Sequence, residues 1–285
     1  MKLKPGFTLA LITIVLWSFS AFLISRLTSF PTLLLIGVAL STGGLVGVFR
    51  FREWRVPLKT FAVGLLGMFV YHLLLVLAFR RAPAVEVNMI NYLWPLLIVI
   101  LSPLILKGYG LRFNHIAGAL IGFSGAGLIF SGSHFSLNVA NLNGYLLAAG
   151  AAVAWALYSL LTKRVAPFSS FAVGGFCLAS GLLALGLFFA SSLTTHTPFP
   201  SASPAEWSLL LLLGAGPNGV AFLLWDAALK RGDPRQIGTL TYLTPILSTF
   251  NLVVFGQQPF SYLTLAALAL IVAGAVIGSL TTASA

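Results

Sequence analysis

Long apolar stretches separated by short polar loops run through the whole chain. Each stretch has about 20 residues, the length that an α-helix needs to cross a hydrocarbon core of ~30 Å. The pattern predicts ten such helices, over residues 7–24, 31–49, 61–79, 85–106, 113–130, 144–161, 168–193, 207–229, 237–255 and 260–280. We therefore expect an all-α integral membrane protein without a soluble domain.

Composition supports this interpretation, because 59% of the residues are hydrophobic, 7% are charged and the mean hydropathy is +1.01. The first apolar stretch follows Lys2 and Lys4, as in a signal peptide, but no small-residue cleavage site comes after it. We interpret it as the first membrane helix. Cys177 is the single cysteine, which excludes a disulfide framework and a cysteine metal site. We expect no cofactor and no metal.

The loops carry their positive charge mostly on one side of the predicted membrane domain. With the amino terminus in the cytoplasm, thirteen of the sixteen Lys and Arg residues are cytoplasmic, and Arg26, Arg80 and Arg81 are the exceptions. An excess of Lys and Arg marks cytoplasmic loops. Both termini are therefore predicted to be cytoplasmic, and the formal net charge of +11 requires no nucleic-acid partner.

The chain contains an internal repeat. Tyr92-Leu93-Trp94-Pro95 and Tyr242-Leu243-Thr244-Pro245 lie 150 residues apart, and Trp17 and Trp155 are each followed nine residues later by an arginine. Five helices per half is an odd number, so the second copy enters the membrane from the opposite side. We predict a first half at 1–131, a periplasmic connector at 132–143 and an inverted second half at 144–285.

The repeat predicts where a binding site lies. Pro95 and Pro245 fall near the centres of the fourth and ninth helices, where proline removes a backbone donor and displaces the carbonyl four residues earlier, at Asn91 and Thr241. One such proline is usually a packing kink. Interrupted helices at matching positions of two inverted halves are typical of the substrate site of a secondary transporter, at the membrane midplane.

Aromatic side chains with polar tips surround these prolines. They are Trp17, Tyr71, Tyr92, Trp94, Trp155, Tyr158, Trp225 and Tyr242. A pocket with aromatic walls favours flat amphipathic solutes and ammonium groups, and Asn88, Asn91 and Asn218 offer polar partners. Because no Lys or Arg lies near the midplane, sugar phosphates are disfavoured. The alternative for Trp17, Trp155 and Trp225 is a place at the membrane interface.

Three titratable groups are candidates for proton coupling, because ionisable residues inside a membrane are often functional. They are His72, Glu86 and Asp226. The alternatives are structural: a hydrogen bond from His72 to a carbonyl, an ion pair of Glu86 with Arg80 or Arg81, and an ion pair of Asp226 with Lys230.

Two further patterns affect the interpretation. Gly122-Phe123-Ser124-Gly125 matches the serine motif of rhomboid-type intramembrane proteases, but no late helix offers a histidine base, so we treat the match as coincidence. Glycines four residues apart, as at Gly118 and Gly122, predict close helix packing within a monomer, with the fifth and tenth helices together. No ATP-binding loop is present, so transport would draw on a gradient.

Several motifs together resemble the YddG-type aromatic amino acid exporters, in the EamA branch of the drug/metabolite transporter superfamily. Helix four carries the most specific similarity, with Val85-Glu86-Val87, Met89 and Asn91-Tyr92-Leu93-Trp94-Pro95. Further similar stretches are Leu16-Trp17-Ser18, Tyr71, Trp155-Ala156 with Tyr158 and Thr162, Trp225, and Tyr242 with Thr244-Pro245. Asp226, where a neutral amide is expected, and Asn88, where a small residue is usual, depart from the pattern.

The resemblance implies ten helices in two inverted halves, a central cavity and alternating access. It also implies export of aromatic amino acids and related amphipathic metabolites across the bacterial cytoplasmic membrane. The alternatives are an exporter of another metabolite or drug and, outside transport, a lipid scramblase or an intramembrane protease.

Overall fold

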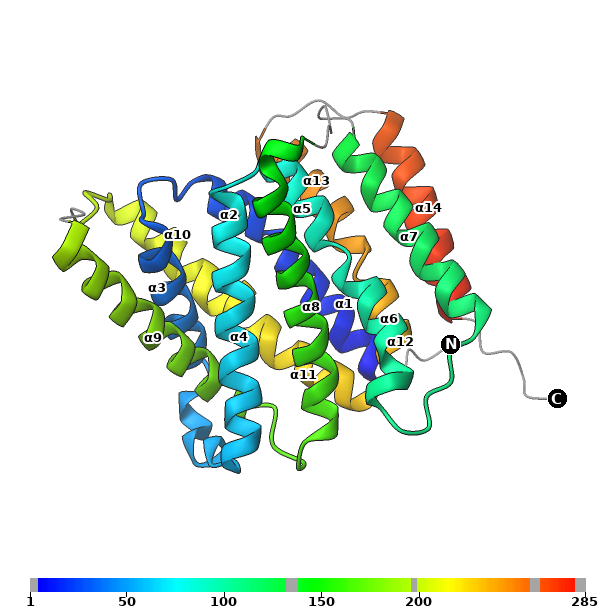
Figure 1. Cartoon of the computed structure of the whole chain (residues 1–285), viewed down its shortest axis with the longest axis horizontal. Helices are drawn as coiled ribbons and strands as arrows, with labels where there is room; N and C mark the ends of the chain where they lie inside the picture. Colours follow the sequence, from blue (N-terminus) through cyan, green and yellow to red (C-terminus); the bar gives the residue numbers. More distant parts are fainter. Residues whose placement is uncertain (1–4, 132–137, 196–198, 257–261, 280–285) are drawn as a thin grey trace.

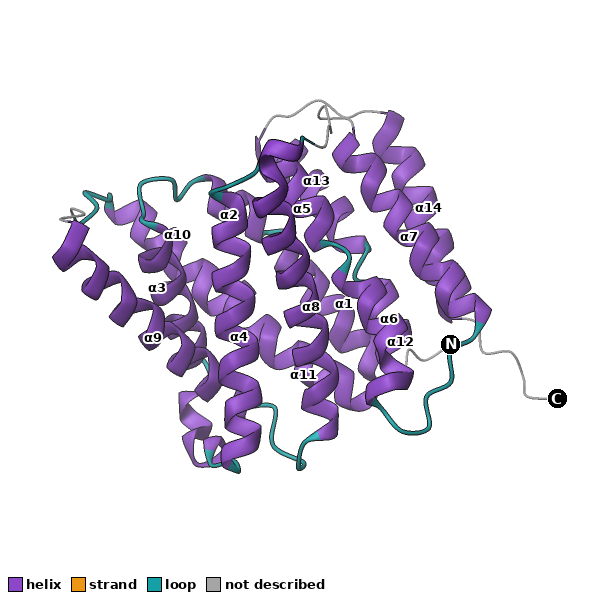
Figure 2. Ribbon diagram, viewed as in Figure 1, coloured by secondary structure: helices purple, strands orange, loops and turns teal. Residues whose placement is uncertain are grey.

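A computed structural model describes residues 5–131, 138–195, 199–256 and 262–279, and these form helices joined by short loops, with no strand among them (Figure 2). The predicted connector at 132–143 lies partly outside the described residues, as do Lys2, Lys4, His134 and His196. An all-helical architecture suits an apolar chain in lipid, because helices satisfy their own backbone groups.

The helices follow one another without large loops. The first half of the chain contains α1 (Pro5–Ser18), α2 (Ser20–Ser25), α3 (Thr32–Leu45), the 3-10 helix η1 (Val48–Trp54), α4 (Leu58–Phe79), α5 (Ala84–Asn91), α6 (Trp94–Ile105) and α7 (Phe113–Ser131). The second half contains the 3-10 helix η2 (Val139–Asn141), α8 (Leu142–Arg164), α9 (Ala172–Thr195), α10 (Pro204–Ala215), the π-helix η3 (Gly216–Val220), α11 (Ala221–Arg231), α12 (Pro234–Leu240), α13 (Leu243–Gly256) and α14 (Tyr262–Ser279).

Helix is present in each of the ten predicted segments. In the described part of the chain, six helical stretches are long and apolar enough to cross a membrane, or seven if α3 and η1, which bend by 85°, form one span. The protein is therefore a multi-pass membrane protein. Ten crossings remain a prediction.

Besides the segment that α3 and η1 share, four of the predicted segments are interrupted. α1 gives way to α2 at Phe19, α5 to α6 at residues 92–93, α10 to α11 through the π-helix η3, and α12 to α13 at residues 241–242. Pro95 and Pro245 each lie in the first turn of the helix after a break, where the missing amide donor costs least. The Thr241 carbonyl is not orphaned, because it accepts from the Thr244 amide at 2.9 Å.

The helices pair across the two halves of the chain. α3 lies beside α9 at one end of the molecule, α7 beside α14 at the other, and α4 beside α8 between them, with α1 against α11 (Figure 1). The predicted packing of the fifth and tenth helices is confirmed. A Cβ atom on Gly118 would lie 2.5 Å from the Gly278 nitrogen, so the α7 and α14 backbones meet directly.

A loop joining α6 to α7 is held by the second half of the chain. The Lys163 ammonium donates to the Tyr109 hydroxyl at 3.1 Å and to the Gly232 carbonyl at 2.9 Å. The Arg235 guanidinium lies 5.2 Å from the Tyr109 ring centroid and is paired with Asp233 at 2.6 Å. Burial acts to raise the pKa of Asp233, but hydrogen bonds from Arg235 and its charge outweigh burial, so this pKa is lowered.

Candidate functional site

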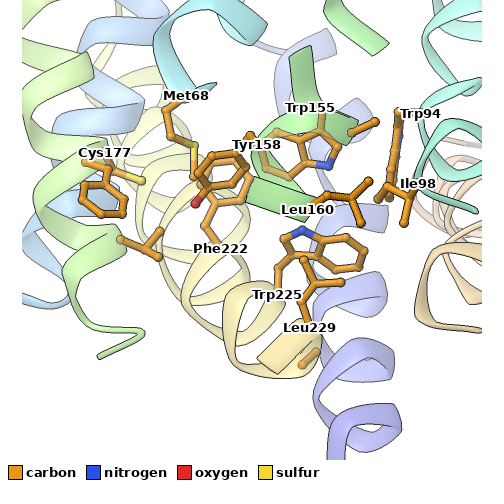
Figure 3. Packing of buried hydrophobic residues seen from close by; sticks show 14 of the residues in the cluster. Met68, Trp94, Ile98, Trp155, Tyr158, Leu160, Cys177, Phe222, Trp225 and Leu229 are labelled. Carbon is orange, nitrogen blue, oxygen red and sulfur yellow. The ribbon is translucent and has the colours of Figure 1, made fainter. Parts of the chain in front are cut away.

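Seven of the predicted site residues meet in the core between α1, α4, α6, α8 and α11. With one more ring they form what we call the aromatic cluster: Trp17, Tyr71, His72, Trp94, Trp155, Tyr158, Phe222 and Trp225. Figure 3 shows Trp94, Trp155 and Trp225 converging on one space, with Tyr158 and Phe222 beside them. Both halves of the chain contribute side chains to it.

Trp155 connects most of the cluster. Its ring centroid lies 4.8 Å from that of Tyr71, 5.3 Å from that of Tyr158 and 5.9 Å from that of Trp17. Aromatic pairs at such separations contribute about 0.5–1.5 kcal/mol each beyond the area that they bury. Trp155 is 3% exposed and Trp225 1%, so both rings lie inside the helix bundle and not on its outer surface.

Trp17 differs from the other tryptophans of the cluster because it is only half-buried. It lies in the last turn of α1, one residue before that helix ends. Its indole Nε1 donates to the Pro217 carbonyl in η3 at 3.1 Å, and its ring lies 5.3 Å from that of Trp225 and 6.1 Å from that of Trp94. A bond from α1 to a π-helical turn therefore positions this ring.

The polar tips of the cluster are only partly satisfied. Trp225 Nε1 donates to Ser159 Oγ at 3.1 Å. His72 Nδ1 lies 2.7 Å from the Met68 carbonyl, and because a carbonyl only accepts, this nitrogen carries the proton. The buried Tyr158 hydroxyl has no hydrogen-bond partner among the described residues. Such a group is costly in an apolar core.

The remaining predicted site residues lie elsewhere. Tyr92 packs with Tyr242, whose ring centroid is 6.4 Å from that of Phe123, in a separate cluster beside α7 and α14. Asn91 is buried next to the aromatic cluster, where its side chain hydrogen-bonds Tyr71, although its Oδ1 has no partner in the described part of the chain. Asn88 is half-buried, and its carbonyl accepts from the Tyr92 amide. Asn91 therefore adjoins the aromatic cluster, whereas Tyr242 lies in the second cluster.

One of the two predicted carboxylate pairings is confirmed. Asp226, 2% exposed, pairs with Lys230 at 2.5 Å, and Lys230 also donates to the Phe168 carbonyl at 2.9 Å. The pairing of Glu86 with Arg80 or Arg81 is wrong: among the described ion pairs none involves Glu86, which is buried and accepts from the Tyr145 hydroxyl. Arg80 instead donates to Thr32 Oγ1 at 2.8 Å.

Two hollows lie outside the aromatic cluster. One of about 470 Å³ is lined by Leu74, Arg81, Asn143, Leu146 and Leu147. The other, of about 300 Å³, is lined by Gly108, Gly110, Arg112, His115, Asp233, Arg235 and Gln236. Neither is lined by a predicted site residue. At the cluster itself, aromatic rings occupy the space between the helices.

Sequence reasoning missed three participants. Phe222 lies 5.3 Å from Trp155 between ring centroids, Ser159 bonds Trp225, and Pro217 bonds Trp17. Phe222 and Ser159 carry no signal, since each resembles many other residues of an apolar helix. The run Gly216-Pro217-Asn218-Gly219 did carry one, because two glycines and a proline inside an apolar segment indicate an interruption.

Similarity to known transporters extends along nearly the whole chain. The EamA-like transporter family matches residues 4–131 and again 142–280. The aromatic amino acid exporter YddG of Ancylobacter novellus is 38% identical over 96% of both chains, and that of Escherichia coli is 27% identical over 92% of both. The biotin transporter of Salmonella typhimurium is 25% identical over 92% of this chain and 90% of its own. A solved crystal structure has a TM-score of 0.87 at 36% identity, covering 96% of both chains.

Proposed function

The chain belongs to the EamA-like transporter family, and on this premise we propose that it exports aromatic amino acids and related amphipathic metabolites by alternating access. The observation that carries the proposal is the aromatic cluster, which is built from both halves of the chain at their junction. Stacked and edge-on rings select flat apolar solutes. The names of the relatives from Ancylobacter novellus and Escherichia coli support the same substrate class.

The pattern of helix contacts supports an inverted repeat. If the halves 1–131 and 144–285 are equivalent, then α8 corresponds to α1–α2, α9 to α3, α10–α11 to α4, α12–α13 to α5–α6, and α14 to α7. Exchanging the halves converts the contact of α4 with α8 into that of α11 with α1, and both exist. The contacts of α3 with α9 and of α7 with α14 convert into themselves. Any two-fold axis has this property, and with five crossings in each half that axis lies in the membrane plane.

Transport requires the cluster to open. The Trp17 ring contacts those of Trp155 and Trp225, so an aromatic solute enters only when these rings move apart. The breaks beside Pro95 and Pro245 lack continuous helical hydrogen bonding, and we propose that they are the flexible points of this movement. Rocking of one set of helices against the other would then expose the cluster to each side in turn.

The charge pattern supports a choice of membrane, and the partners of the buried titratable groups support a choice of energy source. We propose a bacterial cytoplasmic membrane with both termini inside, because the basic loops fall on one side. The solute gradient drives export. The His72, Glu86 and Asp226 side chains each have a local partner, Met68, Tyr145 and Lys230, which favours facilitated export over proton coupling.

A second candidate is export of another metabolite, and the similarity to a biotin transporter favours it. Proteolysis is not supported, since the chain belongs to a transporter family and Ser124 Oγ bonds the Leu120 carbonyl of its own helix at 2.9 Å. A cellular test separates the two export candidates. Expression should raise bacterial tolerance of 4-fluorophenylalanine several-fold but not tolerance of azaleucine, a toxic aliphatic analogue. Equal tolerance of both, or of neither, would support the second candidate.

A further inference from the structure

Two irregularities of the fold meet at Trp17. α1 ends at Ser18, directly after Trp17, and the π-helix η3 presents the Pro217 carbonyl to the Trp17 indole at 3.1 Å. π-Helical turns are uncommon and occur often at functional sites. Packing alone does not require both irregularities at one side chain, because the regular helix α11 places the buried Trp225 in the same core.

The Trp17 indole is surrounded by aromatic rings and has a hydrogen-bond acceptor for its N–H. Its ring lies 5.9 Å from Trp155, 5.3 Å from Trp225 and 6.1 Å from Phe222 between centroids, and its one polar atom has a carbonyl acceptor. An aromatic amino acid that entered this core would need the same contacts. Trp17 is half-buried where Trp155 and Trp225 are fully buried, so it is the ring of the three that is partly accessible.

We infer that Trp17 is a displaceable occupant of the aryl subsite, and that the Pro217 carbonyl accepts the ring N–H of a bound indole once Trp17 has moved out. This inference rests on the proposed function. Substrate side chain and Trp17 side chain then compete for one slot with walls at Trp94, Trp155, Trp225 and Phe222. Without a replacement donor the Pro217 carbonyl loses its indole partner, so an indole ring has an advantage over a ring of the same shape without N–H.

Displacement would also be communicated to the helix break of the other half. The Ser18 hydroxyl, next to Trp17, accepts from Asn251 Nδ2 of α13 at 2.9 Å. Moving the end of α1 therefore changes a contact with the helix that follows the break at residues 241–242. Occupation of the slot and movement of α13 are linked through this hydrogen bond.

Tryptophan binding to the purified full chain in detergent tests the inference, because the direction in which the Kd changes on mutation of Trp17 distinguishes an occupant from a wall residue. Trp17→Phe keeps a ring but removes the donor, which weakens the occupant, so the Kd of tryptophan should fall about 2- to 10-fold, the size of one neutral hydrogen bond. Trp17→Ala removes the occupant and should also bind tryptophan more tightly than the unmodified protein. Unchanged or weaker binding in Trp17→Phe would overturn the inference, because a wall residue gives that result.

Two controls define the comparison. Trp225→Phe also removes an indole hydrogen bond, to Ser159, but it thins a wall and should weaken binding. Trp207→Phe, at a distant contact with Phe30, should leave the Kd unchanged. Thermal unfolding of each variant identifies any that has lost its fold, and Trp17→Ala then serves as the second variant.

The acceptor role has its own probe. The tryptophan isostere 3-benzothienylalanine has sulfur in place of the ring N–H, and it should bind about 2- to 10-fold more weakly than tryptophan to both the unmodified protein and Trp17→Phe. Equal affinity would exclude the Pro217 carbonyl as the substrate acceptor. If no aromatic amino acid binds to any form, the proposed function fails as well, whereas binding that weakens in the Trp17 variants overturns this inference alone.

Discussion

Trp155 is the residue on which aromatic selectivity depends most, because its ring contacts those of Trp17, Tyr71, Tyr158 and Phe222. Trp155→Ala should reduce tryptophan and phenylalanine flux at least 10-fold while changing threonine flux little, since threonine has no ring to stack. Truncating such a buried ring costs about 3–5 kcal/mol of stability. Flux into vesicles, normalised to folded protein, measures the effect.

A matched control for this variant is Phe113→Ala, which removes a ring that is 85% exposed at the start of α7. Its flux and selectivity should equal those of the unmodified protein. Equal losses of aromatic and aliphatic flux in Trp155→Ala would assign that residue to packing rather than to substrate selection.

The members of the candidate site could be predicted where they are aromatic residues with polar tips, because such residues are rare in apolar helices. Trp17, Trp94, Trp155 and Trp225 stood out in the sequence and lie together. Tyr92 and Tyr242 stood out equally but lie in another cluster. Each lies at a helix break, at residues 92–93 or 241–242, where the side on which a residue points does not follow helical periodicity. Phe222 is one of 23 phenylalanines and had no distinguishing feature.

At the scale of elements, close approach of α7 and α14 depends on glycine. A Cβ atom on Gly118 would lie 2.6 Å from the Gly274 carbonyl oxygen and 2.5 Å from the Gly278 nitrogen, and both are backbone atoms that cannot turn aside. Gly118→Ala should therefore force the helices apart and destabilise the protein by about 1–3 kcal/mol. A lower unfolding temperature in detergent is the expected observation.

Gly186→Ala in α9 is the control for that variant. A Cβ atom there meets nothing within 4 Å, so the unfolding temperature should stay the same or rise slightly. If Gly118→Ala were as stable as Gly186→Ala, close packing of α7 on α14 would be excluded.

The loop between α6 and α7 provides a second test among the elements. Lys163 holds it through the Tyr109 hydroxyl, and Lys163 also lies 5.4 Å from the Tyr109 ring centroid. Lys163→Met should release the loop and speed amide hydrogen exchange at Tyr109 and Gly110 by about 10-fold or less, since a half-buried contact of this kind contributes about 1 kcal/mol. Lys59→Met, at an exposed position, should leave that exchange unchanged.

Helix positions were largely predictable from apolar run lengths, but their interruptions were predictable only where proline marked them. The breaks beside Pro95 and Pro245 carry that signal, and so does Pro217 in η3, which we interpreted as part of a continuous helix. The end of α1 at Ser18 has no proline or glycine nearby. It is set by tertiary contacts, including the bond of Ser18 to Asn251, which a local pattern does not contain.

For the whole molecule, two halves contribute to one aromatic cluster, and we propose that this cluster is the substrate path. The partners of His72, Glu86 and Asp226 lie within the protein, so the account also expects flux without proton coupling. Glycine spacing predicted the pairing of α7 with α14, but the other pairings across the halves could not be read from the sequence, since run lengths say nothing of which faces meet.

Efflux of labelled tryptophan, phenylalanine, threonine and lysine from proteoliposomes, with and without an imposed pH gradient, tests this central claim most directly. We predict flux of tryptophan and phenylalanine at least 10-fold above that of threonine and lysine, and the same rate in both conditions. Equal flux of all four, or no flux of the two aromatic amino acids, would contradict the account.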